Sequence, residues 1–257
     1  MIKQESNKKQ SNKRPHVRSN IVREPGMYHL YAKQVDGDRL FFRQSDFKKL
    51  LYTIEDARKK FHSDIVIVVC MYNHFHMIVD SPDIMGFKTY IARKYCGWYN
   101  VRHKRNGPLF LDSTIKSSPI SYPEAQREKI LYNANNPVKA NICNSPFRYK
   151  YSSLKLFTKK PGVWKELIKI NKEIILDLFG TLDDFKKALA VEVEYKKLVR
   201  GGEKQSKGKE LLRVARRWYL GSSSAGALLA MVPRNCLSIN TPRILPPLFR
   251  TVILQTS

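Results

Sequence analysis

The chain has 257 residues and a formal net charge of +25, from 47 Lys and Arg residues against 22 Asp and Glu residues. Its hydrophobic content of 42% is enough to bury a core. This excess of positive charge is larger than solubility requires and indicates a polyanionic partner. Nucleic acid is a better candidate for that partner than an anionic membrane. The sequence has no lipidation motif, amphipathic anchor or long apolar stretch, so we expect no membrane partner.

The cysteines and the N-terminal composition indicate the compartment. The four cysteines are widely scattered, and none forms the CxxC pair typical of zinc ribbons and thioredoxin-like sites. The first residues are polar and basic, without the hydrophobic core of a signal peptide. We therefore expect a reducing, intracellular and cytoplasmic location.

The first elements follow from local composition. Residues 1–25 are rich in Lys, Arg, Asn and Ser and poor in large apolar side chains, which predicts a flexible basic arm. A strand is expected over 27–32, and residues 39–43 are expected to continue its pairing after a turn. Ser45 is typical of a helix N-cap, and apolar residues follow it at helical spacing.

Two histidines follow a buried strand. Residues 65–71 form a β-branched apolar run, and residues 74–79 are expected to pair with it as a hairpin. Because side chains alternate across a strand, His74 and His76 point to one face and Phe75 to the other. The two imidazoles then lie roughly 7 Å apart, close enough to converge on a metal ion. Such a triplet also occurs as an ordinary core or surface pair, so alone it leaves a structural role open.

The following elements complete a domain. A helix over 87–103 interleaves aromatic and basic side chains, and a strand is expected over 109–115. Ser121 and Glu124 form a capping-box pattern that opens a third helix, which should end near Asn136 because Pro137 follows. The order strand, helix, hairpin, helix, strand, helix predicts an α+β domain, a ferredoxin-like antiparallel sheet with helices on one face.

The character of the chain changes beyond residue 160. Helices are expected over 163–179 and 181–199, followed by a polar linker and a basic helix over 209–219. The predicted organisation is therefore a basic arm at 1–25, the α+β domain at 26–160, a helical extension at 161–200, and a basic helix with a poorly ordered tail at 201–257.

Tyr132 and Asn136 are four residues apart in the third predicted helix and therefore share a face. This spacing places a potential nucleophile, the phenol, beside a potential hard metal ligand, the amide oxygen. A tyrosine near a helix end, followed by an asparagine cap, is also a common structural arrangement. The pair alone does not decide between the two interpretations.

Together these segments resemble the REP-associated tyrosine transposases, single-tyrosine members of the HUH endonuclease superfamily. The resemblance covers roughly residues 23–157 through many short matches in one order. The matching segments are the opening strand at 25–30, the hairpin at 69–79 with Asn73-His74-Phe75-His76, the helix and its exit at 93–110, Tyr132 with residues 136–140, and Tyr151-Ser152-Ser153.

The resemblance implies a HUH endonuclease fold and the site residues of that family. His74, His76 and Asn136 would be the metal ligands, Tyr132 the nucleophile, and Mg²⁺ or Mn²⁺ the cofactor. The implied activity is cleavage and rejoining of single-stranded, hairpin-forming DNA through a 5′-phosphotyrosine. The protein would act as a monomer or a homodimer, with Tyr132 from the same or the partner subunit. The basic residues expected to contact DNA are Arg93, Lys94, Arg102, Lys104, Arg105, Lys116 and Lys139.

The chain departs from the family pattern near the expected nucleophile. Asn133 and Asn135 occupy positions that are usually apolar, and Tyr72 stands where the family usually has a proline. Lys116 is out of register with the family's basic segment. These departures favour, as an alternative, a decayed or domesticated relative that binds DNA without cutting it. A second alternative is an RNA-binding protein in which the histidines are incidental.

Overall fold

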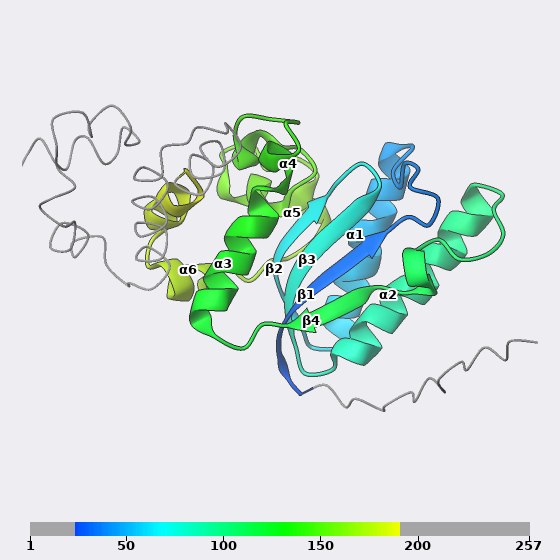
Figure 1. Cartoon of the computed structure of the whole chain (residues 1–257), viewed down its shortest axis with the longest axis horizontal. Helices are drawn as coiled ribbons and strands as arrows, with labels where there is room; N and C mark the ends of the chain where they lie inside the picture. The colour runs from blue at the N-terminus through cyan, green and yellow to red at the C-terminus, as the bar shows by residue number, and fades with distance from the viewer. Residues whose placement is uncertain (1–23, 191–257) are drawn as a thin grey trace, which may run out of the picture.

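The computed structural model describes residues 24–190 (Figure 1). Most of the predicted basic arm, the end of the helical extension and everything predicted for 201–257 lie outside this range. The elements are β1 (Gly26–Lys33), α1 (Gln44–Lys60), β2 (Asp64–Cys70), β3 (His74–Ser81), α2 (Ile84–Arg102), η1 (Leu111–Ser113), β4 (Lys116–Pro119), α3 (Pro123–Ala134), α4 (Asn136–Lys139), η2 (Pro146–Arg148), η3 (Ser153–Phe157), α5 (Trp164–Leu167) and α6 (Glu173–Phe179). A further helix begins at residue 182.

The strands form one four-stranded sheet in the order β2-β3-β1-β4, and every neighbouring pair is antiparallel. Residues 71–73 connect β2 to β3, so the predicted hairpin is confirmed, and the Met71 N–H donates to the His74 carbonyl at 2.8 Å. The antiparallel sheet expected from the sequence is therefore present, with β3 and β1 at its centre.

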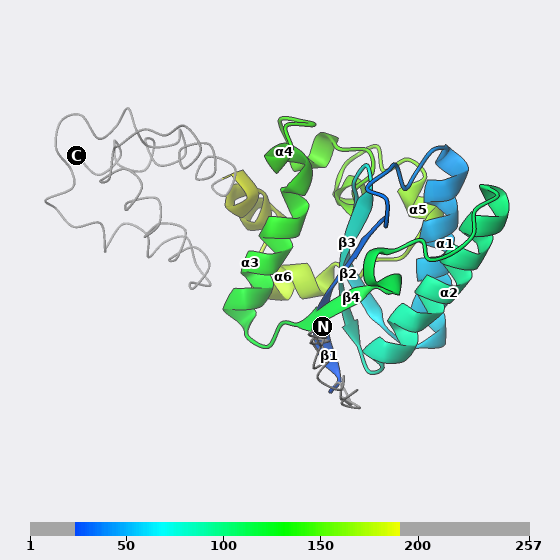
Figure 2. The ribbon, with the colours of Figure 1, turned by 45° about the vertical axis from the view of Figure 1, so that its right-hand side comes forward.

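Helices cover both faces of this sheet, as the view in Figure 2 shows. α1 and α2 pack on one face, and Leu30, Val68 and Phe75 lie in the core between these helices and the sheet. α3, α6 and the helix that begins at residue 182 pack on the other, against Val69 and Ile78. The prediction of helices on one face is therefore wrong for α3. The physical reason lies in β2: residues 65–70 are all buried, so both faces of this strand need an apolar partner.

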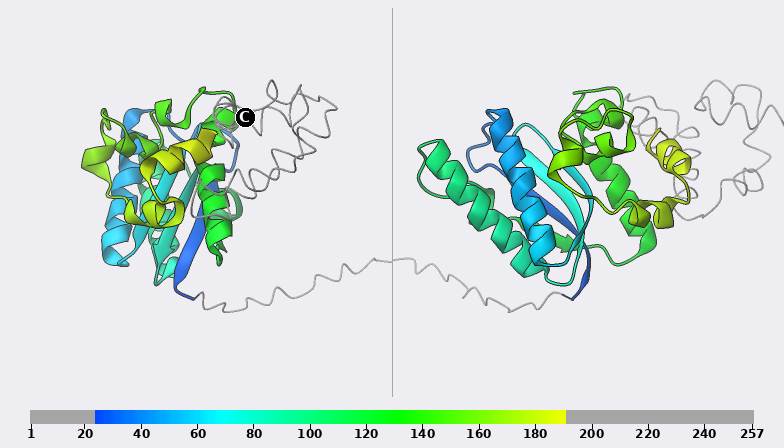
Figure 3. Two further views of the ribbon diagram at one scale, coloured as in Figure 1. Left: turned by 90° about the vertical axis from the view of Figure 1, so that its left-hand side faces the viewer. Right: turned by 180° about the vertical axis from the view of Figure 1, so that it is seen from behind.

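The chain beyond residue 160 crosses from one face to the other around β2, the edge strand (Figure 3). Ile168 and Ile170 lie in the core beside α1, whereas Ile175 and Phe179 lie in the core beside α3. Between them the Asn171 N–H donates to the Ile65 carbonyl at 2.8 Å. The single helix predicted over 163–179 is therefore wrong, because one straight helix cannot bury apolar groups on both faces. The crossing segment also covers an edge that would otherwise be open to pairing.

Trp164 fixes this segment to the domain. Its side chain is 1% exposed, and its ring meets the Phe47 ring of α1 edge-on at 5.3 Å. The indole Nε1 donates to the Lys150 carbonyl at 2.8 Å. Residues on both sides of position 160 therefore share one core.

Four local predictions differ from the structure, and the first is the Ser45 N-cap, because α1 begins at Gln44 with Arg43 as its N-cap. Residues 39–43 form a loop, not a strand, and the strand predicted over 109–115 begins only at Lys116. Asp112 and Ser113 have positive φ angles of 57° and 55°, which a strand cannot contain. The third helix begins at Pro123 with Tyr122 as its N-cap, not at Ser121, because proline is suited to the first helical position. Within residues 24–190, no helix has the length and apolar content needed to cross a membrane.

Candidate functional site

His74 and His76 lie on the face of the sheet that α3 covers. Phe75 between them belongs to the core beside α1, and Ile78, on the side of His76, belongs to the core beside α3. The two imidazole rings are 5.1 Å apart between centroids and perpendicular to one another. His76 is buried, and His74 is half-buried.

β1 adds two more rings to this face. Its antiparallel register places Tyr31 opposite His76 and His29 opposite Ile78. His29 stacks on His76 with 5.3 Å between centroids, and the His29 Nε2 and His76 Nδ1 atoms are 3.0 Å apart. The Tyr31 ring lies 4.9 Å from His76 and 5.7 Å from His74. Neither His29 nor Tyr31 is recognisable as a site residue from the sequence, because the register between β1 and β3 is not visible in either segment alone.

The contacts of Asn73 determine the tautomer of His74. The Asn73 Nδ2 atom donates to the Gly37 carbonyl at 2.9 Å, so its Oδ1 atom faces the His74 Nδ1 atom, 2.7 Å away. An amide oxygen only accepts, and therefore His74 Nδ1 carries the proton. The Nε2 atom of His74 then holds the lone pair that a metal would bind.

Burial keeps the three histidines neutral. It lowers the pKa of His76 to about 3 and that of His29 to about 4, and nearby positive charge acts in the same direction. The pKa of His74 is also lowered, first by burial and then by Lys33. Neutral imidazole is the form that binds metals, so these rings need not lose a proton at neutral pH before acting as ligands.

α3 and α4 carry the other predicted site residues. Pro137 has no N–H to continue the helical ladder, so α3 ends at Ala134 and α4 begins at Asn136. Tyr132 stays half-exposed, and the Lys139 Nζ atom lies 4.7 Å from its ring centre and 3.5 Å from its hydroxyl. Lys129 lies 5.7 Å from the same ring centre.

The same two lysines act on His76. Lys129 and Lys139 both lower the pKa of His76, after the larger effects of burial and the neighbouring histidines. Tyr132 in turn contributes to the raised pKa of Tyr31, whose main cause is burial. Tyr132 therefore lies within electrostatic range of the ring cluster formed by His29, Tyr31, His74 and His76.

Three asparagines at the junction of α3 and α4 are buried. Asn133 and Asn135 are at most 1% exposed, and Asn136 is 7% exposed. Asn135 donates to the Leu189 carbonyl at 3.4 Å. Within the described residues, neither polar atom of the Asn133 amide makes a hydrogen bond of ordinary geometry, and neither does the Asn136 Nδ2 atom. The Asn133 side chain nevertheless lies close to His29. Its contact raises the pKa of His29, whereas the larger effect of burial lowers it.

The candidate DNA contacts are divided between two sides of the sheet. Lys116 lies opposite Tyr31 in β4, where it pairs with Asp112 at 2.6 Å, and Lys139 lies beside Tyr132. Arg93, Lys94 and Arg102 are exposed on α2, on the opposite side from the histidines. Lys104 is exposed in the loop that follows α2.

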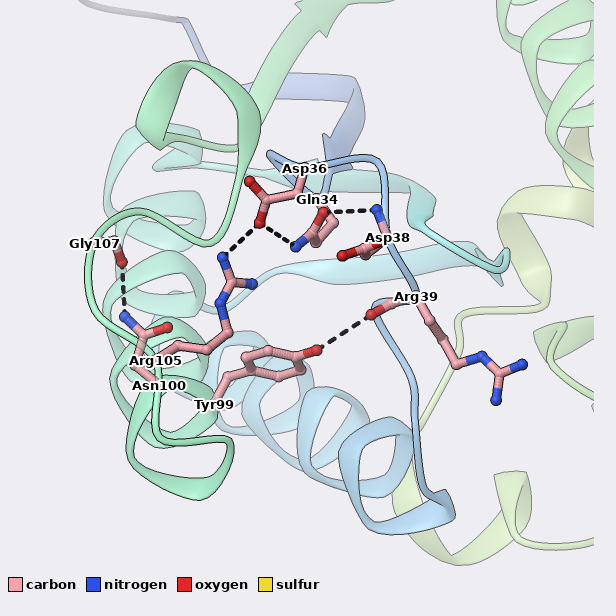
Figure 4. Close-up of polar contacts among 8 residues, drawn as sticks. All are labelled: Gln34, Asp36, Asp38, Arg39, Tyr99, Asn100, Arg105 and Gly107. Atoms are coloured by element: carbon pink, nitrogen blue, oxygen red, sulfur yellow. Dashed lines mark hydrogen bonds and ion pairs between the residues drawn. The ribbon is translucent and has the colours of Figure 1, made fainter.

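Arg105 has a partner on the loop after β1 (Figure 4). Its Nη2 atom donates to Asp36 Oδ2 at 2.8 Å, and Asp36 also accepts from Gln34 Nε2 at 3.1 Å. Nearby, the Tyr99 hydroxyl donates to the Arg39 carbonyl at 3.3 Å. These contacts give Arg105 a structural role in fixing the loop to the end of α2.

No cluster of three or more His, Cys, Asp or Glu side chains suited to a metal ion occurs within residues 24–190. A metal bound by His74 and His76 would therefore need a ligand of another kind, such as an amide oxygen.

No protein-family model and no curated protein matches the sequence. Among solved structures, the chain is similar to a REP-associated tyrosine transposase bound to a REP hairpin, with 15% sequence identity and a TM-score of 0.41. The match covers 57% of this chain and 84% of that chain. A likeness this limited leaves the function to be argued from the residues of the site.

Proposed function

We propose that the chain is a metal-dependent, single-tyrosine transposase of the HUH type, which cleaves and rejoins single-stranded, hairpin-forming DNA. The observation that carries this proposal is the sharing of two lysines: Lys129 and Lys139 flank Tyr132 and also lie close enough to His76 to lower its pKa. The antiparallel sheet with the strand order β2-β3-β1-β4 supports the proposal.

The residues present fit Mg²⁺ or Mn²⁺. His74 and His76 are neutral, and in each ring the Nδ1 atom is engaged by another side chain, which leaves Nε2 for the metal. Asn136 is buried at the junction of α3 and α4, and its amide oxygen would be the third ligand. Two imidazoles and an amide oxygen leave positions open for water and phosphate oxygens. The bound metal would polarise the scissile phosphate and offset its growing negative charge.

Tyr132 would carry the covalent step. Its hydroxyl oxygen forms a bond to the phosphorus atom while the bond from phosphorus to the 3′ oxygen breaks. The phenol proton is lost and the 3′ oxygen gains one, so the products are a 5′-phosphotyrosine and a free 3′-hydroxyl. Lys139, at 3.5 Å from the phenol oxygen, would favour the phenolate that develops during attack. The reverse reaction with another 3′-hydroxyl rejoins DNA without an energy source.

The positive charge of the chain indicates the kind of partner it binds. A net charge of +25 favours a polyanion, and Lys116, Lys129 and Lys139 place part of it around the candidate site. The similar solved structure is bound to a REP hairpin, which makes a hairpin the first substrate to test.

The decisive experiment is a search for the covalent adduct. The full chain would be incubated with labelled single-stranded hairpin DNA and Mn²⁺, then resolved on a denaturing gel and mapped by mass spectrometry. We expect a labelled protein band whose modified peptide contains Tyr132, and no band in EDTA. DNA binding without any adduct would reject the endonuclease and leave a DNA-binding protein.

That second candidate, a relative that binds DNA without cutting, has a specific observation in its favour. Asn133 and Asn135 are both buried next to Tyr132 and Asn136, so the departures from the family pattern lie inside the candidate site. An unlabelled RNA hairpin of the same sequence, added as competitor, separates both candidates from an RNA-binding function.

A further inference from the structure

The feature that the proposed function does not use is the contact behind His76. The His76 Nδ1 atom is 3.0 Å from the His29 Nε2 atom, a normal hydrogen-bond distance, and the two rings stack at an interplanar angle of 10°. His29 reaches this place because β1 is the neighbour of β3 in the sheet. The contact therefore joins β3, which carries the candidate metal ligand His76, to β1, which carries no candidate ligand.

The protons in this contact can be assigned from the chemistry of imidazole. A hydrogen bond between two imidazole rings needs an N–H donor on one ring and a lone-pair acceptor on the other, and a neutral imidazole has one of each. If His76 offers Nε2 to a metal, its proton must be on Nδ1, and this N–H donates to His29 Nε2. His29 then carries its own proton on Nδ1.

Asn133 completes this series. Its amide is fully buried, faces His29 and makes no hydrogen bond of ordinary geometry within the described residues. A buried amide without a partner destabilises the fold, so its presence needs an explanation. An amide oxygen that accepts the His29 Nδ1–H, directly or through one water, would supply it.

We propose that His29 and Asn133 form an outer shell behind His76, which fixes the ring with its proton on Nδ1 and its Nε2 atom directed to the metal. This inference rests on the proposed function. It gives His29 a positioning role, and it explains a buried asparagine at a position that is usually apolar in the family the chain resembles. His74 has a simpler outer shell, in which Asn73 accepts from its Nδ1. Outer-shell partners of this kind orient metal-binding histidines and raise their basicity.

The test measures Mn²⁺ binding to the full chain by calorimetry, with no DNA present. Loss of an outer-shell partner commonly lowers metal affinity on the order of 10–100-fold, and we expect this for His29→Leu. Two conservative variants make the test independent of folding losses. The side-chain amide of glutamine reaches the place of Nε2 and that of asparagine does not, so His29→Gln should retain affinity and His29→Asn should lose it.

The second measurement reports the tautomer without metal. Nitrogen-15 spectra of the metal-free wild type should show the His76 proton on Nδ1, and His29→Leu should show it divided between Nδ1 and Nε2. Asn133→Leu should lower Mn²⁺ affinity, and it should also lower stability against urea, because it leaves the buried His29 Nδ1–H without an acceptor. A purely structural asparagine would change the stability and leave the Mn²⁺ affinity unchanged.

The outcomes separate this inference from the proposed function. Mn²⁺ binding by the wild type with equal affinity in the His29→Gln and His29→Asn proteins would overturn the outer shell and leave the metal site standing. A wild type that does not bind Mn²⁺ would overturn both. His62→Asn, at an exposed histidine outside the ring cluster, serves as the control and should bind as the wild type does.

Discussion

Lys139 lies directly against Tyr132, with its Nζ atom 3.5 Å from the phenol oxygen and 4.7 Å from the ring centre. Because the same lysine acts on His76, the candidate nucleophile and a candidate metal ligand are linked within one chain. This arrangement favours a tyrosine supplied by the same subunit over one supplied by a partner. The lysine also adds positive charge where a phosphate would have to enter.

Replacing Tyr132 by Phe should abolish the covalent adduct and leave the fold intact. The change removes one half-exposed hydroxyl, so the free energy of unfolding should stay within about 0.5 kcal/mol of the wild type. DNA affinity should change little, since the lysines remain. Denaturing gels for the adduct, together with urea titrations, check this prediction.

Tyr31 provides the matched control for the nucleophile. Its ring touches both candidate ligands, and Tyr132 influences its pKa, so it is the other phenol in position to attack. Tyr31→Phe should still form the adduct. An adduct that survives in Tyr132→Phe and disappears in Tyr31→Phe would show that Tyr31, and not Tyr132, is the nucleophile.

Removing a candidate ligand should weaken Mn²⁺ binding in an order set by ligand strength. His74→Ala and His76→Ala should lose most of the affinity, and Asn136→Ala less, because an amide oxygen is a weaker ligand than imidazole. Calorimetric titration of each variant measures the affinity, and circular dichroism confirms that it is folded. Unchanged binding in both histidine variants would exclude this metal site.

The two faces of the sheet should differ in their effect on DNA binding. Lys139→Gln removes a charge beside the ring cluster and should reduce the slope of log affinity against log salt by about one. Lys94→Gln removes an equally exposed charge from α2, on the opposite side, and should leave the slope unchanged. Fluorescence anisotropy in EDTA at several salt concentrations makes the comparison. Equal effects would mean that the DNA also follows α2.

The segment beyond residue 160 should be part of the cooperative unit. Trp164→Ala removes a fully buried indole that packs on Phe47, so it should lower the free energy of unfolding by about 3–5 kcal/mol. Lys165→Ala, at the exposed neighbouring position, should change it by less than about 0.5 kcal/mol. Urea titrations followed by circular dichroism measure both. If Trp164→Ala unfolds at the wild-type urea concentration, residue 160 is a real domain boundary.

Local periodicity in the sequence was enough to predict β1, the hairpin of β2 and β3, and the placement of His74 and His76 on one face. These features depend on residues a few positions apart, and the alternation of side chains along a strand is fixed by backbone geometry. The spacing of Tyr132 and Asn136 is local in the same sense. The sequence therefore determined which side chains are candidates for the chemistry.

Only the tertiary structure decided which side chains surround these candidates. His29 and Tyr31 join the histidines through the register of β1 against β3, which pairs residues 41 or more positions apart in the chain. α3 covers the histidines because β2 is buried on both faces, and the crossing between residues 170 and 175 follows from the same requirement. Register and layering are set by the burial of apolar surface between distant segments, so no window of the sequence contains them.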